Sequence, residues 1–325
     1  MGDGCGGIAS SRSELIGVIR AHEADGNSKP HALNARTRAL LETADTPPSP
    51  APTNRHSTRD RGCAVVWLRN NEYEITVNPK SAPVSVAEHY QSLLAERYSW
   101  MFGSFEQKAA EQEALFKRLS LHHDPKGPAL DLGCGSGFQS VALARLGFEV
   151  TAVDFSERLL QELTQHTGAL PITAMQGDLR ELGQFPDESS QVVVCMGDTL
   201  THLPARADIP TLFRAVKRIL KPGGKVIISF RDLNEELKGL DRFVPVKSDP
   251  DRIMTCVLEF EPETVLVTDL FYERTQSGWS FHRSSYRKIR IAPSAVAEEL
   301  RGAGLMVTFR DIIAGFQILA AVKPE

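Results

Sequence analysis

Short apolar runs alternate with helix-forming segments through the middle of the chain. The runs lie at residues 129–132, 149–153, 172–175, 191–196 and 225–230. We expect helices between them, and residues 211–220 illustrate the pattern with apolar side chains at helical spacing: Leu212, Phe213, Val216, Ile219 and Leu220. Strands that alternate with helices predict a parallel, doubly wound α/β sheet. A ligand of such a sheet lies at the carboxyl ends of the strands.

The pattern changes after residue 230. Three longer β-rich runs follow at residues 252–260, 264–273 and 279–291, joined by connections of a few residues. Connections this short fit antiparallel hairpins, because a parallel crossover needs a dozen or more residues. A helix with proline in its first turn is expected at 293–301, followed by a closing antiparallel pair at 305–311 and 315–322. The sequence therefore predicts an antiparallel insert after the fifth strand.

The segment before the first core strand is expected to be helical. Apolar and aromatic residues recur at helical spacing between residues 85 and 100, and a second helix is expected at 105–119. Two β-rich runs at 64–68 and 73–77 predict a hairpin or an irregular arm. Residues 1–62 are poor in aromatics and contain a proline run, and we expect them to form a disordered tail.

These patterns divide the chain into three parts. They are a tail at 1–62, a β-rich arm at 63–83 and one domain at 84–325. Within that domain we expect a ligand-binding core at 126–232, an antiparallel flap at 242–291, and a closing helix and strands at 293–323.

Composition narrows the class of protein. The chain has 325 residues, of which 42% are hydrophobic and 24% charged, as in ordinary globular proteins. Its net charge of −4 disfavours a nucleic-acid partner. It contains no apolar run long enough for a membrane span and no signal-peptide pattern. Its five cysteines are scattered without metal-ligand spacing, so we expect no metal and a cytoplasmic protein. Acidic residues in the tail argue against the alternative of a mitochondrial transit peptide.

A glycine-rich turn follows the first core strand. The sequence Asp-Leu-Gly-Cys-Gly-Ser-Gly occupies residues 131–137, and the next strand ends in Asp154, 21 positions after Gly133. Glycines let a ligand approach the main chain closely, and an acid at that distance can accept bonds from ribose hydroxyls. NAD and S-adenosylmethionine both fit this arrangement. The dinucleotide pattern G-x-G-x-x-G requires glycine where Phe138 stands, which disfavours NAD.

The glycine turn and four later motifs resemble those of the class I S-adenosylmethionine-dependent methyltransferases. The later motifs are Asp154, Gly177-Asp178-Leu179, the run from Val192 to Asp198, and Leu220-Lys-Pro-Gly-Gly224. The resemblance extends from about Val84 to the C-terminus. It implies a Rossmann-like doubly wound sheet with an antiparallel insert and an N-terminal helical cover. The insert is similar to those of small-molecule N-methyltransferases of the glycine/sarcosine type.

The resemblance implies which residues bind S-adenosylmethionine. Asp131 would pair with the ammonium group, Asp154 would accept both ribose hydroxyls, and Asp178 would accept from the adenine amino group. Helix capping or a surface position is the competing interpretation for each acid. The full set of expected cofactor contacts is Asp131, Gly133, Gly135, Gly137, Asp154, Asp178, Leu179 and Met196.

Other residues are candidates for contact with the methyl acceptor. A base near neutral pH would suit His202, a substrate anion would suit Arg231, and Tyr286 lies on the same strand face as His282. The candidate catalytic residues are His202, Arg231 and Tyr286. Aromatic residues of the N-terminal helices that are expected either to line the pocket or simply to pack against the sheet are Tyr90, Tyr98 and Trp100.

We therefore expect a methyltransferase that acts on a small molecule, with an amine as the favoured acceptor and S-adenosylhomocysteine as the product. The alternatives are a protein or RNA methyltransferase, an NAD-dependent oxidoreductase, and a non-catalytic S-adenosylmethionine-binding subunit. The insert would form either a flap over the substrate or a contact between subunits of a homo-oligomer.

Overall fold

The computed structural model describes residues 65–69, 72–76, 82–121, 126–276 and 278–325. The tail expected at 1–62 lies outside these ranges. In the arm, β1 (Val65–Arg69) and β2 (Glu72–Thr76) pair antiparallel, which corresponds to the hairpin among the two expected alternatives.

The largest sheet has seven strands in the order β12-β13-β7-β6-β3-β4-β5. Its strands are β3 (Pro128–Leu132), β4 (Glu149–Asp154), β5 (Ile172–Gln176), β6 (Ser190–Cys195), β7 (Leu220–Phe230), β12 (Met306–Ile313) and β13 (Phe316–Val322). Strands β3 to β7 run parallel to their neighbours in the sheet, and β13 runs antiparallel to both β7 and β12. The predicted doubly wound sheet and its closing antiparallel pair are confirmed.

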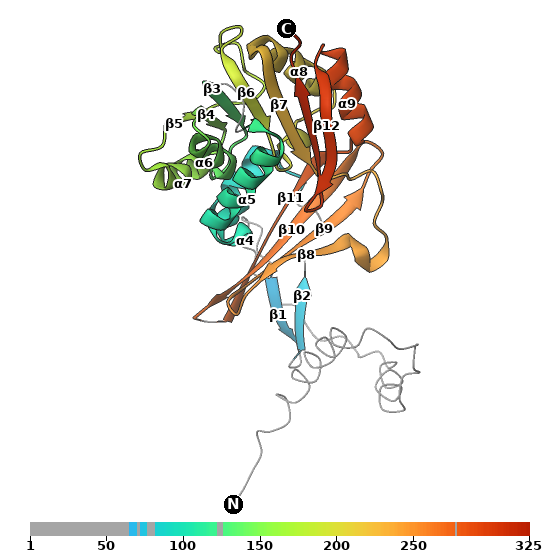
Figure 1. Cartoon of the computed structure of the whole chain (residues 1–325). Coiled ribbons are helices and arrows are strands. Elements are labelled where there is room, and N and C mark those ends of the chain that lie inside the picture. The colour runs from blue at the N-terminus through green and yellow to red at the C-terminus, as the bar shows by residue number, and fades with distance from the viewer. Residues whose placement is uncertain (1–64, 70–71, 77–81, 122–125, 277) are drawn as a thin grey trace, which may run out of the picture. The chain divides into compact units, whose positions relative to one another are not determined.

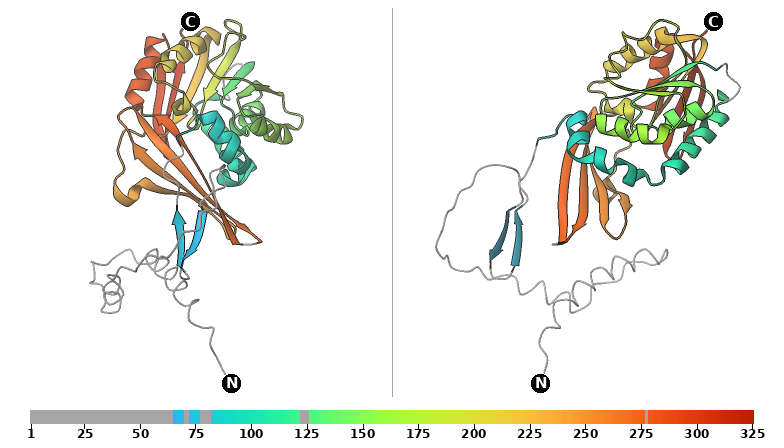
Figure 2. Two further views of the ribbon diagram at one scale, coloured as in Figure 1. Left: turned by 180° about the vertical axis from the view of Figure 1, so that it is seen from behind. Right: turned by 90° about the vertical axis from the view of Figure 1, so that its left-hand side faces the viewer.

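Helices cover both faces of this sheet (Figure 2). They are α5 (Phe105–Arg118), α6 (Phe138–Arg145), α7 (Glu157–Thr167), α8 (Asp208–Ile219) and α9 (Pro293–Gly302). Val193 of β6 is buried with α8 and α9, whereas its neighbours Val192 and Val194 are buried with α5 and α6. Successive side chains of a strand point to opposite faces, so a strand buried on both sides is apolar throughout. This explains the continuous apolar runs in the sequence.

The connection from β5 to β6 differs from the expectation. We expected a helix between each pair of core strands, but residues 177–189 form only turns and irregular structure. Gly183 and Pro186 disfavour a helix here, because glycine loses much backbone entropy and proline lacks an N–H. Leu182 and Phe185 pack against the α8–α9 face and cover it without a helix.

The insert forms a separate four-stranded antiparallel sheet in the order β11-β10-β9-β8. Its strands are β8 (Phe243–Ser248), β9 (Arg252–Phe260), β10 (Thr264–Thr275) and β11 (Gly278–Ile289). Figure 1 shows these strands extending from the end of the parallel sheet at which β7 terminates. The sequence analysis found the runs for β9, β10 and β11 but missed β8. Proline at position 245 weakened the signal, and β8 is an edge strand, where proline is tolerated.

The helix expected over residues 85–100 is broken into four short pieces. They are α3 (Val86–His89), the π-helical η1 (Tyr90–Leu94), the 3₁₀ helix η2 (Ala95–Arg97) and α4 (Tyr98–Phe102). Ser85 and Glu88 form a capping box that starts α3. A π-helical turn changes which side chains share a face, and such turns are frequent at functional sites.

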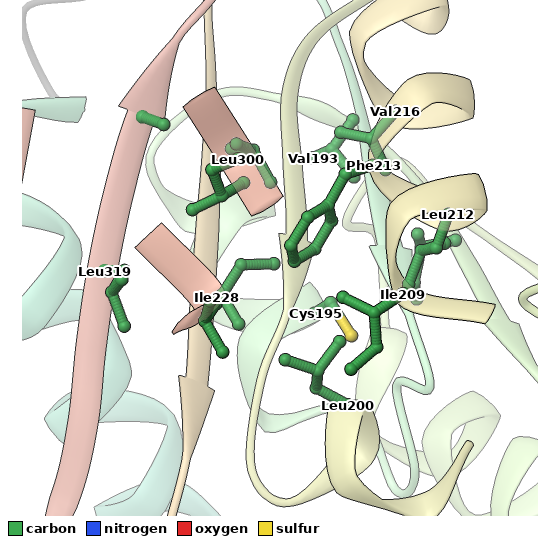
Figure 3. Close-up of a cluster of buried hydrophobic side chains, with 14 of the residues drawn as sticks. Val193, Cys195, Leu200, Ile209, Leu212, Phe213, Val216, Ile228, Leu300 and Leu319 are labelled. Atoms are coloured by element: carbon green, nitrogen blue, oxygen red, sulfur yellow. The ribbon is translucent and has the colours of Figure 1, made fainter. Parts of the chain in front are cut away.

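The α8–α9 face supplies a test of the fold. Phe213 of α8 is fully buried, and its ring lies among side chains from β6, β7 and α9 (Figure 3). We expect Phe213→Ala to lower the free energy of unfolding by about 3–5 kcal/mol, through lost burial and a cavity. Urea unfolding followed by circular dichroism measures this. The control Leu240→Ala, at a side chain that is 84% exposed, should change it by less than about 0.5 kcal/mol.

Candidate active site

The glycine turn lies between the end of β3 and the start of α6. Gly133, Gly135 and Gly137 have φ angles of +70°, +55° and +94°, which residues with side chains rarely adopt. A Cβ on Gly133 would lie 2.3 Å from the Thr199 side chain, and one on Gly137 would lie 2.1 Å from Leu163. These positions therefore require glycine for both conformation and space.

Asp154, at the end of β4, holds this turn. Its Oδ2 accepts a hydrogen bond from the Gly135 N–H at 2.9 Å, and its Oδ1 accepts one from the Ser156 N–H at 2.8 Å. Burial raises the pKa of this carboxyl, and the backbone donors oppose the rise. Asp154 thus fixes the turn in the structure, and its contact with ribose remains a prediction.

Asp131 is buried one strand away, at the end of β3. Its Oδ2 accepts a hydrogen bond from the Ser140 hydroxyl at 2.6 Å. Burial raises the pKa of Asp131 to about 7 despite this bond, and the negative charge of Asp154 adds to the rise. The nearby Ser136 hydroxyl, within the turn, is buried without a hydrogen-bond partner among the described residues. A ligand with a positive charge and a polar group would satisfy both groups.

The remaining predicted cofactor residues lie farther along the same edge of the sheet. Asp178 follows β5 and pairs with Arg180, which lowers the pKa of its carboxyl. Leu179 is half-buried against the α8–α9 core, and Met196 is buried in the core on the α5–α6 face. Their adenosine contacts remain predictions.

Six rings from six segments gather beside the glycine turn. This aromatic cluster consists of His89, Tyr90, Tyr98, Phe155, His202 and Tyr286. Tyr90 lies 5.5 Å from Phe155, 5.9 Å from His202 and 6.2 Å from Tyr98, measured between ring centroids. Tyr286 of β11 stacks on His89 at 4.1 Å and meets His202 at 5.6 Å. The N-terminal helices, the parallel sheet and the insert therefore converge here.

His202 lies in the 3₁₀ helix η4 (Thr199–His202), after β6. Its Nε2 is buried without a hydrogen-bond partner among the described residues. Burial lowers the pKa of His202 to about 3, and the positive charge of Lys288 contributes to the shift. The imidazole is consequently neutral at physiological pH, with one polar atom available to a ligand.

A second charged group adjoins the cluster. Asp198 accepts a hydrogen bond from the Arg231 backbone N–H at 3.0 Å, and its carboxylate pairs with both the Arg231 guanidinium and Lys288 Nζ. Burial alone would raise the pKa of Asp198, but the two cations hold it well below its ordinary value. Sequence analysis missed Lys288, although its position two residues after Tyr286 places both on one face of β11.

The other predicted pocket residues do not join the cluster. His282 is exposed on β11, four positions from the buried Tyr286. Trp100 packs edge-on against Phe271 and donates a hydrogen bond to Asp249 at 2.5 Å. A cavity of about 670 Å³ lies elsewhere, beside the C-terminal ends of α8 and α9, lined by side chains such as Arg218 and Lys323 that are ion-paired.

Within the part of the chain that the structure describes, no group of three or more His, Cys, Asp or Glu is arranged to hold a metal ion. None of the helices in the described ranges is long and apolar enough to cross a membrane.

The glycine turn lies within a stretch that matches a known family. Residues 130–228, from β3 to β7, match the family described as "Methyltransferase domain". This stretch is therefore similar to a methyltransferase domain. The strand order agrees with the class I fold, which the solved structures below share.

Curated relatives match about a third of this chain. The candidate methyltransferase YqeM of Bacillus subtilis (strain 168) is 42% identical over 100 residues, which cover 30% of this chain and 40% of YqeM. The ubiquinone biosynthesis O-methyltransferase of Xanthomonas oryzae pv. oryzae (strain PXO99A) is 35% identical over 102 residues, 31% of this chain and 41% of that protein. The matched segment thus spans less than half the length of these relatives.

Solved structures share the fold over a longer stretch. An S-adenosylmethionine-dependent methyltransferase from Clostridium acetobutylicum ATCC 824 has a TM-score of 0.59 at 16% identity, covering 74% of this chain and 98% of that one. CalS10, an amino pentose methyltransferase from Micromonospora echinaspora solved with S-adenosylmethionine bound, has a TM-score of 0.57 at 15% identity, covering 70% and 95%. The shared fold therefore extends over more of the chain than residues 130–228 alone.

The charged group around Asp198 supplies a second test. We expect Lys288→Met to lower the free energy of unfolding by about 1–3 kcal/mol at pH 7, because the buried carboxylate keeps only one cation. A carboxyl with a depressed pKa contributes stability that is lost as the pH falls, so the effect should shrink toward pH 3. Urea titrations at several pH values measure it. Arg274→Met, which breaks an exposed pair with Asp251, should change the unfolding free energy by less than about 1 kcal/mol.

Proposed function

We propose that this protein transfers a methyl group from S-adenosylmethionine to a small-molecule amine. The observation that carries the proposal is the hydrogen bond between Asp154 and Gly135, which joins the acid expected to bind ribose to the turn expected to approach the cofactor. Fold and family support the cofactor class, since residues 130–228 are similar to a methyltransferase domain and the fold is that of class I.

The residues present fit the cofactor in several respects. An ammonium group beside Asp131 would favour its ionised form and offset the cost of its burial. The Ser136 hydroxyl, unpartnered in the described structure, is available to a ligand. Phe138 stands where a dinucleotide turn requires glycine and packs against Phe105 at 5.0 Å. These features favour S-adenosylmethionine over NAD.

For the proposed reaction, the protein mainly has to position the acceptor and exclude water from the site. S-adenosylmethionine supplies a methyl group already activated on a sulfonium, so the acceptor needs alignment and a free lone pair. The aromatic cluster excludes water from the acceptor side. His202, neutral and with Nε2 unpartnered, accepts a hydrogen bond from the acceptor and orients it. Arg231 and Tyr286 are proposed to contact the acceptor, at the edge and the floor of the site.

An amine acceptor is preferred for two reasons. CalS10, named as an amino pentose methyltransferase, shares the fold. A histidine with a pKa near 3 is also a weak base, and a hydroxyl acceptor requires a base more than an amine does. An O-acceptor is the second candidate, because a relative is named as a ubiquinone biosynthesis O-methyltransferase. A protein or RNA acceptor finds no support in the net charge of −4.

Assembly and location stay predictions from the sequence. The insert carries a cross-strand row of exposed apolar side chains on β9, β10 and β11: Ile253, Tyr272 and Phe281. This row is the basis for proposing contact between subunits. The cytoplasmic location rests on the sequence pattern alone.

Calorimetric titration tests the cofactor. We expect micromolar binding of S-adenosylmethionine and S-adenosylhomocysteine, and none of NAD. Asp154→Ala should weaken S-adenosylhomocysteine binding by about 1.5–3 kcal/mol, through lost charge-assisted hydrogen bonds. Because this substitution also frees the Gly135 N–H, the 2′-deoxy analogue is titrated in parallel. Wild type should lose affinity for that analogue, whereas Asp154→Ala should bind both ligands equally.

The control for this titration is Asp241→Ala, at an exposed acid in the 3₁₀ helix η5 (Gly239–Arg242), which should bind like wild type. Binding of NAD alone, or wild-type affinity in Asp154→Ala, would show that the cofactor site is wrongly assigned.

The raised pKa of Asp131 predicts how binding depends on pH. S-adenosylhomocysteine carries an ammonium group that prefers the ionised carboxylate, and the pKa of Asp131 is about 7 without ligand. Affinity should therefore rise at least about threefold from pH 6 to pH 8. Asp131→Asn should remove the rise and bind weakly throughout. A flat profile in wild type, measured by the same titration, would mean that Asp131 does not face the ammonium group.

A further inference from the structure

The insert carries a buried carboxylate that is not part of the proposed cofactor site. Asp269 lies in the middle of β10 with 2% of its surface exposed, on the same sheet face as Cys256 of β9 and Ser284 of β11. Its Oδ1 accepts a hydrogen bond from the Cys256 thiol at 2.8 Å. In the described structure its ion-pair partner is an imidazole and not a lysine or arginine, although burying a carboxylate without a cation is costly.

The ion-pair partner of Asp269 in the described structure is the imidazole of His89. His89 Nε2 lies 3.0 Å from Asp269 Oδ2, and the ring is fully buried. Neither ring nitrogen of His89 has a partner with hydrogen-bond geometry among the described residues. His89 is the last residue of α3, directly before the π-helical turn that carries Tyr90. The pair therefore lies where α3 meets η1, and the His89 ring nitrogens remain available for hydrogen bonds with a ligand.

This pair borders the proposed acceptor site. His89 stacks on Tyr286, whose ring meets His202 at 5.6 Å. Tyr90 lies close enough to Asp154, Asp198 and Asp269 for all three negative charges to raise its pKa, in addition to the larger effect of burial. Tyr90 thus links Asp269 on the insert electrostatically to Asp154 beneath the glycine turn.

We propose that Asp269, together with His89, is the pair that recognises the positively charged amine of the acceptor. This inference rests on the proposed function and assigns the specificity for an ammonium group to one carboxylate. Asp198 is a poorer candidate, since Arg231 and Lys288 already neutralise it. Among the described residues the ion-pair partner of Asp269 is His89 and no such cation, and an ammonium would supply one. The rings of Tyr90 and Tyr286 add faces that attract a cation.

The same pair suits the proton that an amine must release before it attacks. An ammonium has no lone pair, so its proton has to leave first, and His89 beside a carboxylate can hold it as an imidazolium. The freed lone pair then forms the nitrogen–carbon bond while the carbon–sulfur bond breaks and its electrons remain on sulfur. Asp269 and His89 would accordingly bind the acceptor as a cation and release it as a nucleophile.

Analogues of S-adenosylhomocysteine test this without knowledge of the natural acceptor. In these probes a nitrogen replaces the sulfur and carries an aminoalkyl arm or the matching hydroxyalkyl arm, with ethyl, propyl and butyl spacers. At the best length, we expect wild type to bind the amine roughly tenfold to a hundredfold more tightly than the alcohol. Asp269→Asn should reduce this ratio to about one while binding S-adenosylhomocysteine within about twofold of wild type.

Two variants accompany the test. Asp269→Glu keeps the charge and should keep most of the preference for amines, whereas Glu259→Gln removes an exposed acid from β9 of the same sheet and should leave the ratio unchanged. If Asp269→Asn does not fold, the ratio of amine to alcohol affinity in wild type and in Asp269→Glu still tests the inference.

Equal binding of amine and alcohol arms by wild type at every length would overturn the inference, as would an undiminished ratio in folded Asp269→Asn. In either case intact S-adenosylhomocysteine binding would leave the proposed cofactor site standing. Loss of that binding in wild type would instead remove the proposed function and this inference with it.

Discussion

The carboxylate of Asp154 connects the parts on which the rest of the site depends. It lies at the carboxyl end of β4 and binds the N–H groups of Gly135 and Ser156, one in the glycine turn and one at the start of α7. The turn has dihedral angles that only glycine adopts easily, so it needs such an anchor to keep one conformation. Through this carboxylate, the strand, the turn and the following helix share one geometry.

Buried charge is distributed unevenly around that anchor. Asp198 has two cations and is held ionised, whereas Asp131 has a serine hydroxyl and Asp269 has an imidazole and a thiol. A buried carboxylate without a cation destabilises the fold unless it stays protonated or gains a partner. A cationic ligand gains most binding free energy at a buried carboxylate that lacks a cation. The two undercompensated acids lie on different sheets, Asp131 on β3 and Asp269 on β10, and we assign each to a different proposed ligand.

The contacts of the proposed cofactor half follow from local sequence patterns, whereas only part of the proposed acceptor half does. The glycine turn and Asp154 lie within 22 residues of each other, and their spacing follows from one strand–helix–strand unit. His89 and Asp269 are 180 positions apart, and no local pattern announces that they meet. The π-helical turn after His89, which sets the direction of Tyr90, also has no signal in the apolar spacing. The helix expected before β6 was a wrong prediction that local sequence could have prevented, because Gly183 and Pro186 both disfavour a helix there.

This division between local and long-range contacts bears on how one fold accepts different substrates. The proposed cofactor half lies within residues 130–228, the stretch that matches the family model. The proposed acceptor half takes His89 from α3 and Asp269 and Tyr286 from the insert, all outside that stretch. Changes in those elements can alter the acceptor without disturbing the turn that Asp154 holds. A match confined to the domain therefore supports the reaction type, while the acceptor has to be argued from residues that lie beyond it.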